Sequence, residues 1–143
     1  MRKWFAALSL LSALPAFAAT PEALLQHYTQ QARQENPAFS AFSAERGRQF
    51  YQAEHRSPRG EAVSCATCHT ADPRRPGRTR ANKVIQPLAP AINGERLTDL
   101  AKAEKWFRRN CHDVLGRECT AQEKGDFVHY LLSVKCLFSI SSG

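Results

Sequence analysis

The 143-residue sequence contains a single methionine, Met1, and beyond its N-terminal region no apolar stretch long enough to cross a membrane. It also has no internal repeat, no pattern of the βαβ kind, and neither an HxxxH motif nor a second CxxC beside the one at Cys65. Without a βαβ pattern, a thioredoxin-like redox site is disfavoured. Without further ligand motifs, a structural zinc site is disfavoured as well, because such a site needs four ligands.

The N-terminus has the features of an export signal. Arg2 and Lys3 form a short basic region, residues 5–13 are apolar, and Ala16-Phe17-Ala18 is a small-x-small cleavage signal. We therefore expect residues 1–18 to be a signal peptide cleaved after Ala18, which predicts a periplasmic protein with no stable membrane insertion. A retained anchor is the alternative, but Pro15 interrupts the apolar run early.

Length and charge limit the remaining possibilities. Cleavage after Ala18 leaves 125 residues, which is enough for one domain but not for two. Loss of Arg2 and Lys3 lowers the formal net charge from +7 to +5. A mildly basic exported protein suits an acidic protein partner, or simple solubility, and we expect no nucleic-acid partner.

One motif decides the expected chemistry. Residues 65–69 read Cys65-Ala-Thr-Cys68-His69, the CxxCH pattern of covalent haem attachment. The two thiols lie one helical turn apart, so both can join the vinyl groups along one edge of a porphyrin, and His69 can reach the iron from the same side. The motif predicts one covalently bound haem c with His69 as an iron ligand. Export agrees with this, because bacterial cytochrome c maturation takes place across the inner membrane.

The rest of the chain predicts helices joined by loops, without a convincing strand. Thr20 and Ser43 are expected to cap helices, the first reaching about Asn36. Residues 71–95 contain four prolines and are expected to form a loop. A further helix is expected from Asp99 to Asn110 after Thr98. Thr120 and Glu123 form a capping box that opens the last helix, which carries Phe127, Tyr130, Leu131 and Val134 at helical spacing.

This arrangement resembles class I cytochrome c over residues 43–134. Two segments carry the resemblance: Gly47-Arg-Gln-Phe50-Tyr51, and Phe127-Val-His-Tyr130-Leu131-Leu132. The resemblance implies an all-α fold around one haem, in which these two helices cross closely at Gly47, with Gly125 in the same part on the partner helix. We expect a helical extension at 19–42, a cytochrome domain at 43–138 and a tail at 139–143.

The second axial ligand of the iron is left open by the residues. The usual methionine is excluded, because Met1 leaves with the signal. His27, His55 and His129 fit packing or surface roles better, whereas His112 would give a bis-histidine iron suited to electron transfer only. Asn110 shares a helix face with Ala103 and Phe107, so its amide could meet the iron. From the residues alone, termination of the helix by Asn110 is the favoured interpretation.

A second resemblance changes that weighting. Residues 87–93, 98–111 and 116–120, which include Trp106, Asn110, Cys111 and Cys119, are similar to the Sphaeroides haem protein (SHP) family of oxygen-binding c-type cytochromes. The resemblance implies that His69 and Asn110 bind the iron, that the asparagine leaves on reduction, and that O2, NO or CO then binds. Asn93 is the amide that could be confused with Asn110. The family also suggests a dihaem or membrane-bound cytochrome as electron donor.

The family further implies a disulfide near the haem. Cys111 and Cys119 bracket the loop before the last helix, and a bond there would hold Asn110 in place. It would add about 2–3 kcal/mol in loop-entropy terms. Cys136 is then expected to be a buried free thiol, and its pairing with Cys111 or Cys119 is the alternative.

Two basic clusters remain, at residues 74–83 and 102–109. They fit haem propionates, an acidic redox partner or simple solvation equally well. Pro87 or Pro90 is the candidate for the carbonyl that orients the proximal imidazole. The sequence as a whole predicts a periplasmic monohaem cytochrome with a small gaseous ligand and a redox partner. A closed electron carrier and a haem enzyme acting on the bound ligand are the rival classes.

Overall fold

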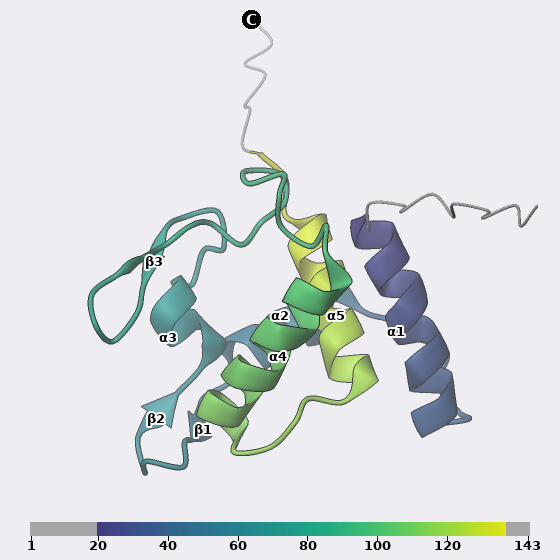
Figure 1. Ribbon diagram of the computed structural model, residues 1–143. Helices are drawn as coiled ribbons and strands as arrows, with labels where there is room; N and C mark the ends of the chain where they lie inside the picture. The colour runs from purple at the N-terminus through teal and green to yellow at the C-terminus, as the bar shows by residue number, and fades with distance from the viewer. Residues whose placement is uncertain (1–19, 137–143) are drawn as a thin grey trace, which may run out of the picture.

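Five helices and two small hairpins make up the fold in the computed structural model, which describes residues 20–136 (Figure 1). The expected signal peptide (1–18) and tail (139–143) lie outside the described residues. In chain order the elements are α1 (Pro21–Glu35), α2 (Ala44–Gln52), β1 (His55–Arg56), β2 (Ala62–Val63), α3 (Cys65–His69), β3 (Gly77–Arg78), β4 (Val84–Ile85), α4 (Leu100–Leu115) and α5 (Ala121–Ser133). The expectation of an essentially all-α fold is confirmed.

The two hairpins are a correction to the expectation of no strands. β1 pairs with β2, and β3 with β4, both antiparallel and each only two residues long. Strands this short carry no alternating pattern that a sequence could reveal. Within the described residues, no helix is long and apolar enough to cross a bilayer.

The starts of the helices follow the expected capping residues. Thr20 accepts a hydrogen bond from the Ala23 amide and Ser43 accepts one from the Arg46 amide. Thr120 and Glu123 form the expected capping box at the start of α5. Each cap satisfies backbone amides that have no partner within the helix.

The crossing of α2 and α5 is the structural centre of the fold. Gly47 of α2 lies against the backbone of Asp126 in α5 so closely that a Cβ atom would overlap the Asp126 carbonyl. Asp126 is almost fully buried, and its carboxylate accepts two hydrogen bonds from the Arg46 guanidinium, at 2.8 and 2.9 Å. The Ser43 amide donates a further bond to the same carboxylate, at 2.6 Å. The expected close approach at Gly47 is confirmed, and the ion pair between the half-exposed Arg46 and the buried Asp126 carboxylate supports it.

Gly125 has a different neighbour from the one expected. Its missing side chain leaves room for the ring of Phe42, in the segment before α2, and not for the backbone of α2 itself. The position therefore admits an aromatic ring between the segment 36–43 and α5.

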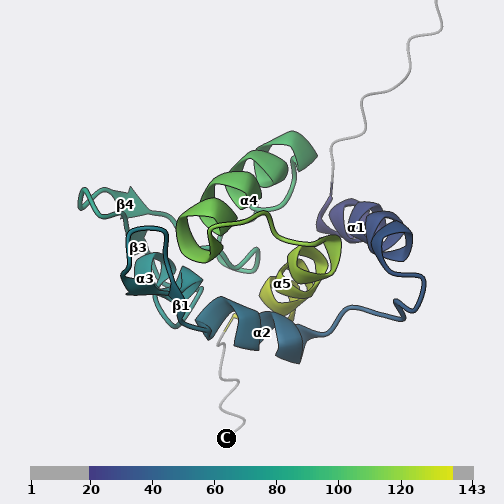
Figure 2. The ribbon, with the colours of Figure 1, turned by 90° about the horizontal axis from the view of Figure 1, so that it is seen from below.

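Helix α1 lies along α5, on the side of the molecule away from α3, as both views show (Figures 1 and 2). Leu24 and Tyr28 of α1 form a buried cluster with Val128 of α5. Partly buried residues of α4, including Ala103 and Phe107, pack on this cluster. The helix outside the class I resemblance thus shares its core with both α4 and α5.

Helix α4 is longer than the sequence analysis expected. It begins at Leu100, capped by Asp99, and continues past Asn110 to Leu115. Gly116 ends it in the left-handed conformation, with a φ of 70°, the usual conformation of a helix-terminating glycine. The expected end at Asn110 is wrong, and with it the interpretation of Asn110 as a helix terminator.

Candidate functional site

The CxxCH residues form the short helix α3, which is fixed at both of its ends. Ser64 and Thr67 form a capping box at its start: the Thr67 amide donates to the Ser64 hydroxyl, and the Ser64 amide donates to the Thr67 hydroxyl. After its end, the hydroxyl of Tyr51, a fully buried residue of α2, donates to the carbonyl of Thr70 at 2.5 Å. The motif is therefore held against the α2–α5 crossing. Sequence reasoning missed this box, although Ser64-x-x-Thr67 was visible in the sequence.

The hairpin β3–β4 packs against the other side of α3. A Cβ atom on Gly77 would overlap the backbone carbonyl of Cys68. Only a glycine lets the hairpin backbone approach the motif this closely. Sequence reasoning also missed Gly77 as a site residue, because it contacts Cys68, nine positions earlier, only in the folded chain.

A cavity of about 1000 Å³ opens between α3, the hairpin β3–β4 and α4. Cys65, Cys68 and His69 line it from α3. Phe107 and Asn110 line it from α4, and further apolar side chains complete its walls: Val63, Ile85, Leu88, Leu97, Phe127 and Leu131. The structure thus brings the motif and the expected second ligand to one mostly apolar chamber.

The ionisable groups of the motif are partly desolvated. Burial, assisted by the positive charge of Arg96, lowers the pKa of His69 to about 4. Its imidazole is therefore neutral at neutral pH, the form whose nitrogen can bind a metal. Burial also raises the pKa of the Cys65 thiol to about 11. Among residues 20–136, neither Cys65 nor Cys68 takes part in a disulfide.

The proline-rich segment after the hairpin is held by Arg96. Its guanidinium donates to the carbonyl of Pro87 at 3.0 Å and to that of Gln86 at 2.7 Å. The side-chain amide of Asn93 donates to the same Pro87 carbonyl at 3.4 Å. The Pro87 carbonyl, one of two expected to orient the His69 imidazole, therefore accepts hydrogen bonds from other groups in this structure.

Asn110 lies within α4, five residues before its end, and lines the cavity with a partly buried side chain. Its side-chain amide makes no hydrogen bond to any group in residues 20–136. The amide atoms are not buried in the protein, so they remain accessible from the open cavity. In this respect it differs from Asn93, whose amide nitrogen and oxygen both hydrogen-bond within the loop.

The histidines weighed as alternative ligands fall into two groups. His112 and His129 are exposed, and neither they nor His27 line the cavity. His55 does line it, and its Nε2 is buried without a hydrogen-bond partner in the described part of the chain. In the first hairpin, His55 pairs with Val63, and Val63 precedes Cys65 by two residues. His55 therefore lies near the start of the haem-attachment motif.

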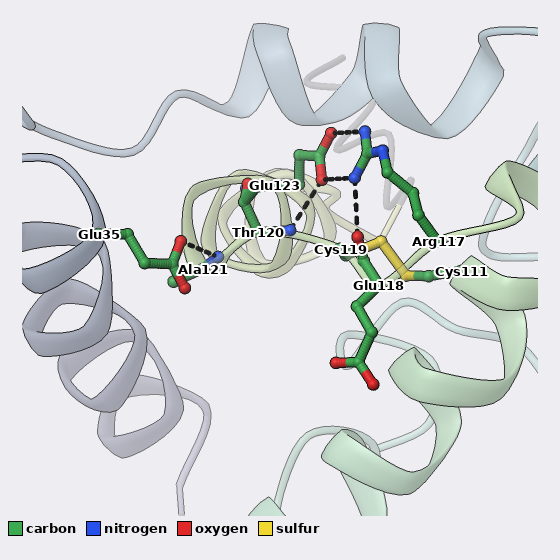
Figure 3. Close-up of polar contacts among 8 residues, drawn as sticks. All are labelled: Glu35, Cys111, Arg117, Glu118, Cys119, Thr120, Ala121 and Glu123. Atoms are coloured by element: carbon green, nitrogen blue, oxygen red, sulfur yellow. Dashed lines mark hydrogen bonds and ion pairs between the residues drawn. A yellow bond between two sulfur atoms is a disulfide. The ribbon is translucent and has the colours of Figure 1, made fainter.

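A disulfide joins Cys111 of α4 to Cys119 before α5, with the two Cα atoms 5.7 Å apart (Figure 3). The intervening turn is reinforced by Arg117, whose guanidinium forms two hydrogen bonds with the Glu123 carboxylate, at 2.6 and 2.8 Å. Asn110 therefore precedes a covalently anchored residue. Cys136 is a partly buried thiol that donates to the carbonyl of Ala91 at 2.9 Å.

The two basic clusters differ in their surroundings. In the first, Arg74 pairs with Asp72 at 2.8 Å and Arg80 with Glu61 at 2.8 Å. In the second, Lys102 and Arg109 line the cavity without an ion pair in residues 20–136. Beside them Trp106 is 41% exposed. The α4 rim of the cavity thus carries two unpaired cations and an aromatic ring, together with the carboxylate of Asp113.

The residues present fit a covalently bound haem. Two thiols at one edge can form the two thioethers, and a neutral imidazole beside them can bind the iron. The apolar walls suit a porphyrin. His55, which also lines the chamber, has a buried Nε2 without a hydrogen-bond partner in the described residues.

Comparison with known proteins agrees with this geometry. A family described as a domain of unknown function (DUF1924) matches residues 37–131. The cytochrome c-type protein SHP of Cereibacter sphaeroides is 41% identical over 129 residues, covering 89% of this chain and 95% of that protein. Cytochrome c'' of Methylophilus methylotrophus is 39% identical over 113 residues, covering 78% of each.

Solved structures of the same two proteins are similar in fold. The crystal structure of oxidised cytochrome c'' has a TM-score of 0.74 at 38% identity, covering 81% of this chain and 95% of that one. Oxidised SHP, described as an oxygen-binding cytochrome c, has a TM-score of 0.68 at 39% identity, covering 79% of this chain and 96% of that one. The chain therefore belongs to the family of monohaem c-type cytochromes that includes SHP and cytochrome c'', and its cofactor is haem c.

Proposed function

We propose that this protein is a periplasmic cytochrome in which His69 and Asn110 are the axial ligands of the oxidised iron, and in which O2, NO or CO binds to the reduced form. One observation carries the proposal. Asn110 lines the same chamber as Cys65, Cys68 and His69, and its amide has no partner among the described residues. The description of the relative SHP as an oxygen-binding cytochrome supports the same function.

When bound, the haem supplies the iron that exchanges electrons and binds a small ligand. The chain supplies two unequal ligands. His69 offers a neutral imidazole held on a capped helix. Asn110 offers a neutral amide oxygen, a hard and weak donor that suits ferric better than ferrous iron. Such a donor can give way to a diatomic ligand in the reduced state.

Around Asn110, α4 offers the chamber an apolar neighbour and no histidine ligand. Phe107 stands one turn before it on the same helix and lines the chamber. The disulfide at Cys111 limits how far this part of α4 can move. No histidine of α4 reaches the chamber, because the only one, His112, is on its exposed face.

We further propose that an acidic redox protein delivers the electron at the α4 rim. Lys102 and Arg109 lie there without a carboxylate partner in the described residues, beside the exposed Trp106. Unpaired cations at a cofactor site steer an acidic partner and fix its orientation. A dihaem or membrane-bound cytochrome with a carboxylate-rich surface fits this requirement. The export signal and the disulfide support a periplasmic location.

The deciding experiment compares axial-ligand variants in the haem-loaded protein. Asn110→Ala is expected to leave the haem covalently attached but to make the ferric iron five-coordinate or water-bound, as seen in its absorption and electron paramagnetic resonance spectra. Asn110→His is expected to abolish rapid CO binding to the reduced protein, because imidazole binds ferrous iron far better than an amide.

Two histidine variants serve as matched controls. His112→Ala is expected to leave the spectra unchanged, since its side chain is exposed. His55→Ala tests the one histidine besides His69 that lines the chamber. A ferric spectrum that changes with either histidine, and stays the same in Asn110→Ala, would establish a bis-histidine electron carrier. Catalytic turnover of the bound ligand with a supplied donor would instead establish an enzyme.

A further inference from the structure

Helix α4 forms one wall of the haem chamber, so whatever holds this helix also controls how readily the chamber opens. Its C-terminal part is anchored by the Cys111–Cys119 disulfide. The ion pair between Arg108 and Glu118, in the same part of the helix, is long at 3.8 Å and exposed. The middle of the helix has no covalent anchor, and it is held by a buried polar cluster at Glu104.

The Glu104 carboxylate joins three helices. It accepts a hydrogen bond from the Tyr28 hydroxyl of α1 at 2.8 Å. It also accepts two from the Lys124 ammonium of α5, at 2.9 and 3.1 Å. Tyr28 is fully buried and Lys124 is 8% exposed. A charge buried as deeply as that of Lys124 persists in proteins only when it is paired and hydrogen-bonded, and Glu104, whose side chain is 27% exposed, is its partner.

The cluster reaches the chamber through Phe107. The Phe107 and Tyr28 rings meet edge to face, with centroids 5.9 Å apart. The Lys124 ammonium lies 5.8 Å from the Tyr28 ring and 6.0 Å from the Phe107 ring. Phe107 stands three residues after Glu104 and three before Asn110 on α4, so the polar cluster and the cavity wall occupy adjoining stripes of one helix. Burial and Glu104 raise the pKa of the Tyr28 hydroxyl, which keeps it a donor.

We propose that Tyr28, Glu104 and Lys124 are positioning residues that hold α4 closed over the distal side of the haem, so that α1 limits the entry of small ligands. The inference rests on the proposed function, because it requires the ligand to bind on the side of the haem that α4 covers. It assigns a purpose to α1, which lies outside residues 37–131 of the matched family. Loosening the cluster shifts the population of α4 towards more open arrangements.

The test is the rate of CO association with the reduced, haem-loaded protein after flash photolysis. Tyr28→Phe keeps the packed ring and removes only the hydroxyl that bonds to Glu104. Glu104→Gln removes the charge and leaves Lys124 without its partner. Both are expected to raise the association rate by about threefold to tenfold, the range that corresponds to the net contribution of one typical hydrogen bond. Lys124→Arg is expected to restore a rate closer to the parent protein than Lys124→Met.

Two controls separate positioning from general loss of stability. Val128→Ala weakens the core around Leu24 and Tyr28 but leaves all three polar groups of the cluster in place, and Glu118→Gln removes the exposed pair on α4. Neither is expected to change the CO rate. Unchanged rates in Tyr28→Phe and Glu104→Gln, or an equal rise in Val128→Ala, would overturn the proposal. Failure of the Asn110 assignment is read separately, from the ferric spectrum of Asn110→Ala, since the CO rate reports on α4 whichever residue binds the oxidised iron.

Discussion

A single missing side chain at Gly47 sets the distance between α2 and α5. We expect Gly47→Ala to lower the free energy of unfolding by about 2–3 kcal/mol, or to prevent folding, because the added methyl group would overlap the rigid backbone of Asp126. Chemical denaturation of the haem-loaded protein measures this. Gly94→Ala is the matched control, since no atom lies within 4 Å of the Cβ it would add. Equal stability of the two variants would contradict the close crossing.

For single residues, the sequence predicted the roles that depend only on neighbours a few positions away in the chain. The roles of Thr20, Ser43 and Thr120 as caps were predictable, because the groups that they bond lie three residues away. The residues alone did not predict the position of Asn110 in the chamber wall, because it depends on where α4 lies relative to α3, and only the resemblance to the SHP family indicated it. The Tyr28–Glu104 contact was beyond reach for the same reason, since 76 positions separate the two residues.

At the scale of elements, the α4–α5 turn owes its order to a covalent bond and to an ion pair. We expect replacement of both Cys111 and Cys119 by alanine to lower the free energy of unfolding by about 2–3 kcal/mol, as loop-closure entropy predicts for a short loop. Chemical denaturation with and without a reductant provides the measurement. Peptide mapping of the parent protein after alkylation should find these two residues linked and Cys136 free. A linked peptide that contains Cys136 would contradict the pairing.

Arg117→Ala is the companion change in that turn, because it removes the two hydrogen bonds to Glu123 while the disulfide stays intact (Figure 3).

The length of α4 also shows what sequence reasoning overlooked here. Val114 lies seven residues after Phe107, on the same face, and Gly116 carries the usual terminating signal. The interpretation of Asn110 as a terminator overlooked this stop signal six residues later, and the longer helix places Asn110 inside α4 instead of at its end.

For the molecule as a whole, acid should weaken the contacts between helices. Burial raises the pKa of Glu104 and of Glu123, but hydrogen bonds from Lys124 and Arg117 outweigh it, so both pKa values lie below the ordinary 4.5. A lowered pKa in the folded state contributes stability that is present above the unfolded value and is lost as the pH falls through the folded value. Thermal unfolding temperatures should therefore drop steeply below about pH 4.5.

Two glutamate variants test whether the titration of Glu123 causes this loss of thermal stability in acid. Glu123→Gln should unfold at a lower temperature at neutral pH and show a shallower decline in acid, because the group that titrates is gone. Glu118→Gln, whose side chain is 64% exposed, should follow the parent curve. Parallel curves for Glu123→Gln and the parent protein would show that the acid sensitivity lies elsewhere.

The position of α1 also matters for how the protein behaves in concentrated solution. The matched family begins at residue 37, after this helix, yet Leu24 and Tyr28 cover Val128 and its partly buried neighbours Phe42, Phe107 and Leu132. A chain that begins at residue 37 would keep the haem motif but would expose these side chains to water as one contiguous apolar patch. Surfaces of this kind drive proteins to stick to one another. We therefore expect a chain without α1 to self-associate more readily than a chain that keeps it.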